Sequence, residues 1–243
     1  MDTLATPPGT AARAEEALPR PRLPYPNERL GRLTAVLERT YGRQERWSQK
    51  SPLDQVIATV LSQRTTYADE RTAFTNLLAR FGDWAGVAAG RVEDIEAEIQ
   101  TTRYPEVKAP RIKELLATVI ERHGAASLDH LYDLSVEEAD AYLRALPGVG
   151  PKTSTFVQLF SMRRPVLPVD THVHRTTTRL GVLPAKTSQA RAHVLLLAMI
   201  PRDAAEILNF HKLYFKLGQR VCHYSRPRCG QCPLAGDCPS SGE

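Results

Sequence analysis

A lysine follows a glycine-rich turn in the middle of the chain. Residues 146–153 read LPGVGPKT, so two glycines, Gly148 and Gly150, stand between two helical segments. Such a turn directs backbone N–H groups outward, and together with the dipole of the next helix these groups can bind a phosphate. We expect Val149 to anchor the turn to the core. The alternative interpretation is an ordinary corner between two helices, where glycine and proline are common.

Lys152 lies in the first turn of the following helix, where its charge opposes the helix dipole. Helix propensity therefore does not explain it. Two roles would explain it: a contact to phosphate, or nucleophilic attack by an amine whose pKa is lowered by the positive helix end. The alternative is an exposed lysine that only improves solubility.

A single carboxylate stands further along, in the run VDTHV at residues 169–173. Asp170 is the only acid between Asp140 and Asp203, and by default it caps the helix that it precedes. If Asp170 lies near a nucleophilic amine, it could have a second role. It could activate the attacking group, or stabilise positive charge that develops on a sugar ring. His172 is interpreted either as a phosphate contact or as an ordinary polar surface residue.

All four cysteines lie near the end of the chain, in the spacing C-x6-C-x2-C-x5-C: Cys222, Cys229, Cys232 and Cys238. Clustered cysteines in an intracellular chain favour metal binding over disulfides. One C-x2-C pair flanked by lone cysteines is more typical of a cuboidal iron–sulfur cluster than of zinc, whose sites usually join two close pairs. Zinc and unligated cysteines are the alternatives. Three arginines accompany the loop and could face a phosphate backbone: Arg220, Arg226 and Arg228.

Helices must position these residues, because apolar residues recur at helical spacing and no segment shows the alternation of a strand. Capping signals mark helix starts at Ser51, Ser135, Asp170, Asp203 and either Thr187 or Ser188. We expect Gly181 and Gly218 to end helices. The chain is therefore predicted to be all-α, with about ten helices. Among them are residues 27–42, 66–80, 92–100, 108–123, 171–180, 188–200 and 203–217.

Composition limits the class of protein. The 243 residues are 42% hydrophobic with a net charge of +5, which suits a globular protein of one large domain or two lobes. The longest apolar run, residues 194–200, is far shorter than the ~20 residues of a membrane-spanning helix. The start of the chain lacks a signal segment, so we expect a cytoplasmic, nucleoid-associated protein.

Charge and proline are unevenly distributed. Residues 144–230 hold 14 Lys or Arg and three acids, which favours a polyanion partner over a merely solvated basic face. Six of the 18 prolines fall within residues 1–26, which are predicted to form a disordered or polyproline-like tail.

The motifs LPGVGPKT, VDTHV and C-x6-C-x2-C-x5-C, in this order and at these separations, resemble those of the endonuclease III family of DNA glycosylases. This is the helix–hairpin–helix superfamily with an iron–sulfur cluster. The resemblance covers roughly residues 28–239. It implies a two-lobed all-α fold with DNA across the cleft: a six-helix barrel over residues 47–161, and a cluster domain built from residues 27–46 and 162–243.

The resemblance also implies roles for single residues. Lys152 matches the nucleophilic lysine of the family and Asp170 its catalytic aspartate. The four cysteines match the ligands of a [4Fe-4S] cluster. The implied activity is that of a bifunctional DNA glycosylase and AP lyase, which flips an oxidised pyrimidine out of duplex DNA, forms a lysine Schiff base and cleaves the strand by β-elimination. A monomer is expected.

Two loops depart from the family pattern. Many relatives read SAQTTD where residues 62–67 read SQRTTY. An ungapped match puts Arg64, which follows Gln63, where a gap-filling glutamine is usual, and it puts Tyr67 where an aspartate is usual. Residues 103–109 read RYPEVKA, where the family often has an apolar wedge; we expect Tyr104 to take that role by stacking. The predicted DNA contacts are Gln63, Arg64, Tyr104, Gly148, Val149, Gly150, His172, Arg226 and Arg228.

Three other functions compete with this one. An adenine mismatch glycosylase is disfavoured because that branch usually lacks the lysine. A non-catalytic or weakly active helix–hairpin–helix DNA-binding protein would use the hairpin and the cluster only for docking. A zinc-binding regulator would be colourless.

Overall fold

The computed structural model describes residues 23–242, and every regular element in that part of the chain is a helix. The predicted all-α class is confirmed. The α-helices are α1 (Glu28–Tyr41), α2 (Pro52–Ser62), α3 (Tyr67–Phe81), α4 (Trp84–Ala89), α5 (Val92–Glu98), α6 (Pro105–His123), α7 (Val136–Arg144), α8 (Pro151–Phe160), α9 (Thr171–Arg179), α10 (Gln189–Met199) and α11 (Ala204–Arg220). Three short 3₁₀ helices are η1 (Asp129–Asp133), η2 (Cys229–Gln231) and η3 (Ala235–Asp237). Residues 1–22 of the predicted tail lie outside the described residues.

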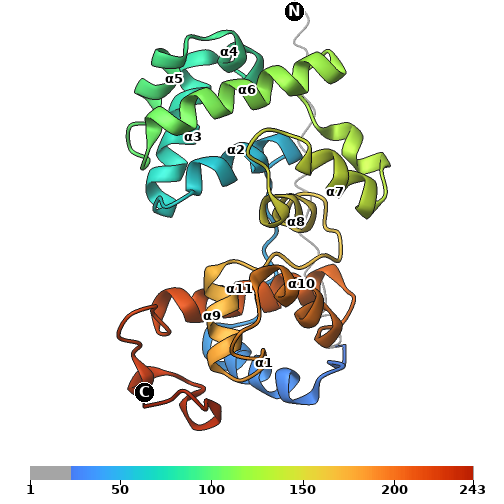
Figure 1. Ribbon diagram of the computed structural model, residues 1–243, viewed down its shortest axis with the longest axis vertical. Coiled ribbons are helices and arrows are strands. Elements are labelled where there is room, and N and C mark those ends of the chain that lie inside the picture. Colours follow the sequence, from blue (N-terminus) through green and yellow to red (C-terminus); the bar gives the residue numbers. More distant parts are fainter. Residues whose placement is uncertain (1–22, 243) are drawn as a thin grey trace, which may run out of the picture.

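The helices pack around two hydrophobic cores, one above the other in Figure 1. The upper core gathers apolar side chains of α2 to α8, including the predicted stripe of α2, whose Val56, Ile57, Val60 and Leu61 are fully buried. None of the helices described in residues 23–242 has the length and apolar character needed to cross a membrane.

The lower core joins the two ends of the described chain. Helix α1 packs there beside α9, α10 and α11, which lie more than a hundred residues later in the sequence (Figure 1). Tyr25 also packs against this core, and a Cβ on Gly31 would lie 3.1 Å from the Cβ of Tyr25. The predicted tail therefore ends earlier than residue 26, because its last aromatic side chain is needed to cover α1.

Helix α8 belongs to both cores. Val157 is buried in the upper core, whereas Leu159 and Phe160 are buried in the lower one. The helix that carries Lys152 is therefore held from both sides, at the junction of the two lobes. The predicted domain limits at residues 47 and 161 remain predictions.

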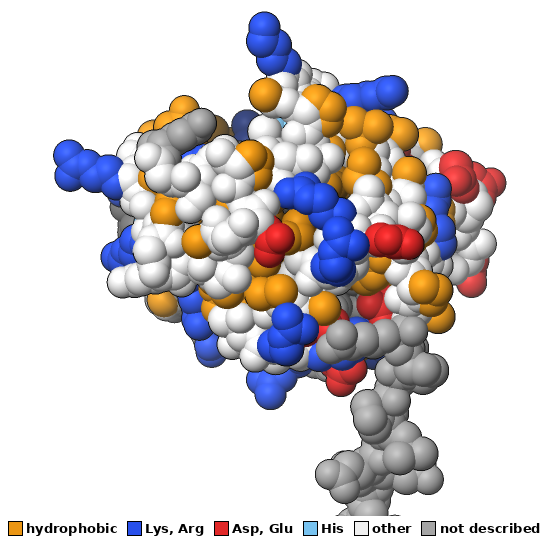
Figure 2. All heavy atoms as spheres, turned by 90° about the horizontal axis from the view of Figure 1, so that it is seen from below, with side chains coloured by type: hydrophobic (Ala, Val, Ile, Leu, Met, Phe, Trp, Pro, Cys, Tyr) orange, Lys and Arg blue, Asp and Glu red, His pale blue; other side chains and the backbone are white. Residues whose placement is uncertain are grey.

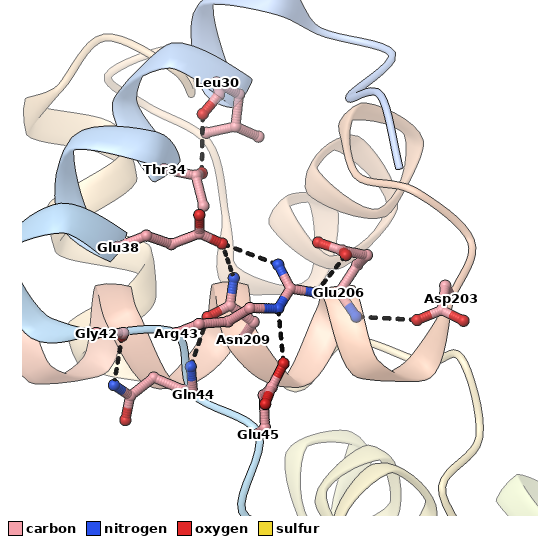
Figure 3. A network of polar contacts seen from close by, with 10 residues as sticks. All are labelled: Leu30, Thr34, Glu38, Gly42, Arg43, Gln44, Glu45, Asp203, Glu206 and Asn209. Carbon is pink, nitrogen blue, oxygen red and sulfur yellow. Dashed lines mark hydrogen bonds and ion pairs between the residues drawn. The ribbon is translucent and has the colours of Figure 1, made fainter. Parts of the chain in front are cut away.

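The connection from α1 up to α2 is fixed to α11 by polar contacts (Figure 3). The guanidinium of Arg43 donates to Glu38 (3.0 Å), to Glu45 (3.1 Å) and to Glu206 of α11. The backbone N–H of Gln44 donates to Asn209 Oδ1 at 2.9 Å. Glu38, Glu206 and Asn209 are buried, so the crossing segment leaves the lower lobe along a defined path.

Most helix starts follow their sequence signals. The side chains of Ser51 and Ser135 cap α2 and α7 in complete capping boxes, and Asp170 caps α9. Ser188, rather than Thr187, caps α10, and Asp203 caps α11. Each such cap is worth about 1 kcal/mol because it satisfies amides that have no partner within the helix.

Two predicted helix limits are wrong. Helix α6 begins at Pro105 instead of residue 108, because proline at the first helical position and Glu106 in the first turn both suit a helix N-terminus. Helix α11 continues through Gly218 to Arg220. Gly218 is required for a close contact with His172 and does not end the helix.

Basic side chains are spread over the lower lobe. Figure 2 looks at the molecule from below and shows Lys and Arg side chains over the whole face, with fewer acidic ones among them. Helices α9, α10 and α11 come from the basic stretch of the sequence. The positive charge of the chain is thus concentrated in the lobe that carries Asp170.

Candidate active site

The glycine-rich turn forms a tight hairpin between α7 and α8. Gly148 has φ +74°, a left-handed conformation that glycine adopts without strain, and the N–H of Val149 donates to the Leu146 carbonyl at 3.2 Å. Val149 is only 6% exposed and packs in the upper core, as expected. Gly150 is the N-cap of α8 and offers no side chain to its first amides. The hairpin therefore presents free backbone N–H groups at the start of the lysine-bearing helix.

A buried lysine organises the loop between α2 and α3. Lys108 of α6 is 2% exposed, and its Nζ donates to the carbonyls of Leu61 (2.7 Å) and Gln63 (2.9 Å) and to Thr65 Oγ1 (2.8 Å). Burial lowers the pKa of Lys108 to about 8. The backbone of Arg64, held between these contacts, has φ +54°, which is uncommon for a residue with a side chain.

The loop before α6 lies against the same segment. The N–H of Arg103 donates to Thr65 Oγ1 at 3.1 Å, and the next residue, Tyr104, has φ +61° with its side chain 49% exposed. Two neighbouring loops thus each place one of the predicted DNA contacts, Arg64 and Tyr104, in a left-handed conformation. Such conformations persist where the surrounding structure enforces them, and they are frequent at functional sites.

Arg111 joins these loops to the hairpin. Its side chain lies over Gly148, where a Cβ would come within 2.5 Å of the Arg111 Cδ, and its guanidinium lies 3.4 Å from Gln63 Oε1. The structure therefore brings Gln63 and Gly148 to one edge of the upper lobe. Sequence reasoning did not identify Arg111, because no local pattern shows which residue of α6 meets the hairpin.

Lys152 and Asp170 both lie near one cluster of aromatic rings. Lys152 is exposed, with Nζ 6.0 Å from the centre of the Phe156 ring, and Phe156 makes an edge contact with His211 at 5.7 Å. Asp170 is 6% exposed, and its Oδ1 accepts from the Val173 N–H at 2.8 Å. The carboxylate is thus fixed as a helix cap at the edge of the same aromatic cluster.

Two histidines are influenced by both charged groups. Burial lowers the pKa of His211, while Asp170 opposes this change and Lys152 adds to it. The pKa of His172 is also lowered by burial, with the same opposed effects of Asp170 and Lys152. Lys152 and Asp170 therefore both lie close enough to these two histidines to influence their pKa values, in opposite directions.

His172 has several partners within the protein. Its Nδ1 is 3.1 Å from an Arg175 nitrogen, which can donate to it, and its ring makes an edge contact with Phe215 at 5.0 Å. The backbone of Gly218 lies directly beneath it. The side chain is half-buried against α11, and its predicted contact with a phosphate stays a prediction.

The four cysteines line one small, partly open cavity in the lower lobe. The cavity is bounded by α9, the end of α11 and the C-terminal segment, and Arg228 also lines it. Within residues 23–242, no three Cys, His, Asp or Glu side chains come close enough to hold a single metal ion. Four thiols around one cavity are a donor set that fits a polynuclear iron–sulfur group, in which each iron takes one thiolate.

Helix α9 connects this cavity to Asp170. Arg175 donates to the carbonyls of Gly218 and Cys222, each at 2.9 Å. One turn later, Arg179 donates to the His223 carbonyl at 2.6 Å and lies 3.4 Å from Cys222 Sγ. Helix α9 thus has the Asp170 carboxylate at its N-terminus, and arginines of its second half bind the cysteine loop.

Comparison with known proteins identifies the family. A model of the HhH-GPD superfamily base excision DNA repair proteins matches residues 57–199, more than half of the chain. Endonuclease III of Thermotoga maritima is 32% identical over 190 residues, which cover 78% of this chain and 84% of that protein. The chain belongs to the HhH-GPD superfamily. It is a DNA glycosylase of the endonuclease III type and functions in base excision repair.

The fold comparison agrees with this assignment. A solved structure of endonuclease III trapped as a covalent intermediate with DNA matches with a TM-score of 0.74 at 25% identity, over 88% of this chain and 96% of that chain. The DNA glycosylase/AP lyase ROS1 of Arabidopsis thaliana is 28% identical over 171 residues, but the chain spans only 12% of its length.

In this glycosylase the predicted residues fall into three groups. Lys152 lies on α8 at the junction of the lobes, and Asp170 and His172 lie at the start of α9. The hairpin is joined through Arg111 to the loop of Gln63 and Arg64, and the loop of Tyr104 lies against the latter. Arg226, with φ +54°, and Arg228 are exposed on the cysteine loop at the far end of α9. His211 is the residue near both Lys152 and Asp170 that sequence reasoning missed, since a lone histidine in an apolar helix carries no motif.

Proposed function

We propose that this glycosylase is bifunctional: it excises oxidised pyrimidines from duplex DNA and then cleaves the strand as an AP lyase through a Schiff base on Lys152. The observation that carries the proposal is the chain of contacts between the two residues: the Lys152 ammonium lies over the ring of Phe156, this ring contacts His211, and His211 binds the carbonyl two residues before Asp170. An exposed amine and a fixed, nearly buried carboxylate at one site are what attack on a sugar and stabilisation of its positive charge require.

The chemistry assigns each group a task. The Lys152 amine, in its neutral form, attacks C1′ of the flipped nucleotide, and the C1′–N bond to the base breaks as Asp170 stabilises the positive charge on the sugar. Ring opening gives a Schiff base between Nζ and C1′. Loss of a proton from C2′ then expels the 3′ phosphate, and water releases the lysine. The solved structure of endonuclease III trapped as a covalent intermediate with DNA supports this route.

The DNA surface in this proposal comprises the three groups of predicted contacts. The hairpin of Gly148, Val149 and Gly150 would bind phosphate through backbone amides of its glycines and of the start of α8, while Val149, whose N–H donates to Leu146, anchors it. Gln63, Arg64 and Tyr104 would probe the duplex where the base leaves the stack, and His172, Arg226 and Arg228 would extend the contact across the lower lobe. We further propose that the protein acts as a monomer on chromosomal DNA in the cytoplasm.

The cofactor in this proposal is a [4Fe-4S] cluster. The cavity lined by Cys222, Cys229, Cys232 and Cys238 supports it. When bound, the cluster would cross-link a loop that has little hydrophobic core of its own. Arg175 and Arg179 would transmit this rigidity to α9.

Borohydride trapping tests the proposed activity. Duplex DNA with an abasic site should form a covalent adduct with the intact protein in the presence of borohydride, and Lys152→Ala should abolish the adduct while retaining duplex binding. A parallel panel of duplexes should show release of oxidised pyrimidines and no release of adenine from mismatches. Failure of the intact protein to form an adduct would rule out the lyase activity.

A further inference from the structure

The three peptide carbonyls that precede Asp170 are each bound by a side chain. His193 of α10 lies with Nδ1 2.8 Å from the Leu167 oxygen, and His211 of α11 lies with Nδ1 2.9 Å from the Pro168 oxygen. The amide of Gln189, at the start of α10, donates to the Val169 oxygen at 2.5 Å. Three consecutive carbonyls are thus held by three donors from two helices.

The segment needs these donors because no other element supplies them. Residues 166–169 are buried and extended, yet no strand within residues 23–242 pairs with them. A buried carbonyl without a partner would cost about 1–3 kcal/mol. The side chains of α10 and α11 therefore take the place of a neighbouring strand, and they determine where the chain arrives at Asp170.

The two histidines donate without adding charge. Because each Nδ1 faces a carbonyl oxygen, it must carry the proton, and Nε2 is left unprotonated in the neutral ring. Burial lowers the pKa of both His193 and His211, which favours this neutral form. A lysine or arginine in the same place would put a positive charge beside Asp170 and compete with Lys152 for its carboxylate.

The aspartate is fixed from its other side by its own helix. Its Oδ1 accepts from Val173, so the cap and the preceding carbonyls together leave the carboxylate little freedom. Phe156 and Phe160 of α8 stack on each other, and the ring of His211 makes edge contacts with both, at centroid distances of 5.7 and 5.3 Å. His211 therefore links the segment that precedes Asp170 to α8, the helix that carries Lys152.

We propose that Gln189, His193 and His211 are positioning residues that hold the backbone before Asp170 and so set its carboxylate opposite the Lys152 amine, an inference that rests on the proposed function. His211 has the largest share, because it alone contacts both the Asp170 segment and α8. A shift of about 1 Å in a reacting group can cost on the order of 100-fold in rate.

A pair of substitutions at His211 separates the hydrogen bond from the volume of the ring. His211→Phe keeps the ring and removes the donor, whereas His211→Asn restores an N–H at the position of Nδ1. With saturating abasic duplex, His211→Phe should trap at least about tenfold more slowly, with duplex affinity within about threefold of the intact protein. His211→Asn should recover most of the rate although it fills the site less well.

Hydrogen exchange at the Val173 amide gives a readout that does not need activity. This N–H donates to Asp170, so a displaced carboxylate should raise its exchange rate about tenfold in His211→Phe and not in His211→Asn. Gln189 is exposed, so Gln189→Ala should fold normally and show smaller changes in the same direction in both measurements. If His211→Phe does not fold, Gln189→Ala tests the positioning role in its place.

The outcomes distinguish the two proposals. If the intact protein forms no adduct, the proposed lyase activity fails, whereas exchange at Val173 still tests the positioning role. Equal loss of rate in His211→Phe and His211→Asn would overturn the positioning role, as would unchanged Val173 exchange in both His211→Phe and Gln189→Ala.

Discussion

Gly218 and His172 are packed so closely that a Cβ on residue 218 would lie 2.7 Å from the Cβ of His172. Real Cβ atoms do not approach to this distance, so the contact requires glycine. It joins the first turn of α9 to the last turn of α11. The glycine therefore sets how near α9, with Asp170 at its start, lies to the aromatic cluster of α11.

Gly218→Ala should force these two helices apart. Overpacking of this kind costs about 1–3 kcal/mol, so the melting temperature should fall by several degrees, and trapping of abasic DNA should slow because Asp170 moves with α9. Gly236→Ala is the matched control, since a Cβ there meets nothing within 4 Å. Equal melting temperatures and rates for the two variants would contradict the close contact.

Asp170→Asn should separate the structural and the chemical task of this residue. Asparagine caps helices as well as aspartate, so the melting temperature should change by no more than about 2 °C. The negative charge is lost, and base release should fall at least about 100-fold in single-turnover assays, with duplex binding retained. Full base release by this variant would exclude a catalytic role for the carboxylate.

Lys108 should make the stability of the fold depend on pH. The folded chain releases the Lys108 proton near pH 8, whereas the unfolded chain holds it up to its ordinary pKa of 10.5. Unfolding therefore takes up a proton between these values, and the free energy of unfolding should rise by roughly 2–3 kcal/mol across this window. In Lys108→Met this increment should be absent, as measured by denaturant unfolding at several pH values.

The same titration should loosen the loop that Lys108 holds. An ammonium has three N–H donors for the three oxygens around it, and a neutral amine has two. Duplex affinity should therefore fall above about pH 8, apart from any change in overall stability, and Lys108→Met should bind duplex weakly at all pH values. If the intact protein and Lys108→Met bound duplex DNA with the same affinity, Lys108 would not organise this loop.

The cysteine loop should carry iron. Protein purified without oxygen should contain about four iron and four sulfide per chain and show the broad visible absorption of an iron–sulfur cluster. Cys238→Ser should lose both and lower the melting temperature, whereas Ser240→Ala, which alters the lining of the same cavity, should not. A colourless protein with one zinc would contradict the proposed cluster.

Most of the helices could be predicted from the sequence, because capping residues mark where they start. Ser51, Ser135 and Asp170 each cap the helix that was expected of them. Helix α4, with only six residues and a glycine inside it, was missed because short elements show little periodicity. Gly218 was misread as a stop, since residue type alone does not distinguish a helix end from a close approach.

The candidate site was only partly predictable. Lys152, Asp170 and the cysteines stand in motifs, so their types and spacing identify them. His211 and His193 stand in none, and each is joined to the Asp170 segment across 43 and 26 residues of chain. Arg111 and its contact with Gln63 depend in the same way on which faces of two helices meet. Such contacts follow from packing and leave no trace in local sequence.

The contact of Arg43 with Glu206 also has a consequence for the order of folding. The two residues are 163 positions apart, which at about 5–20 residues per second is roughly 8–30 s of synthesis. The upper lobe becomes complete within that interval, once Met162 has been made, but α1 still has no partner helix, and its apolar face is exposed beside a charged connection. The lower lobe closes only when α11 arrives, so the nascent chain holds its finished upper lobe before the segment that precedes Asp170 receives the side chain of His211.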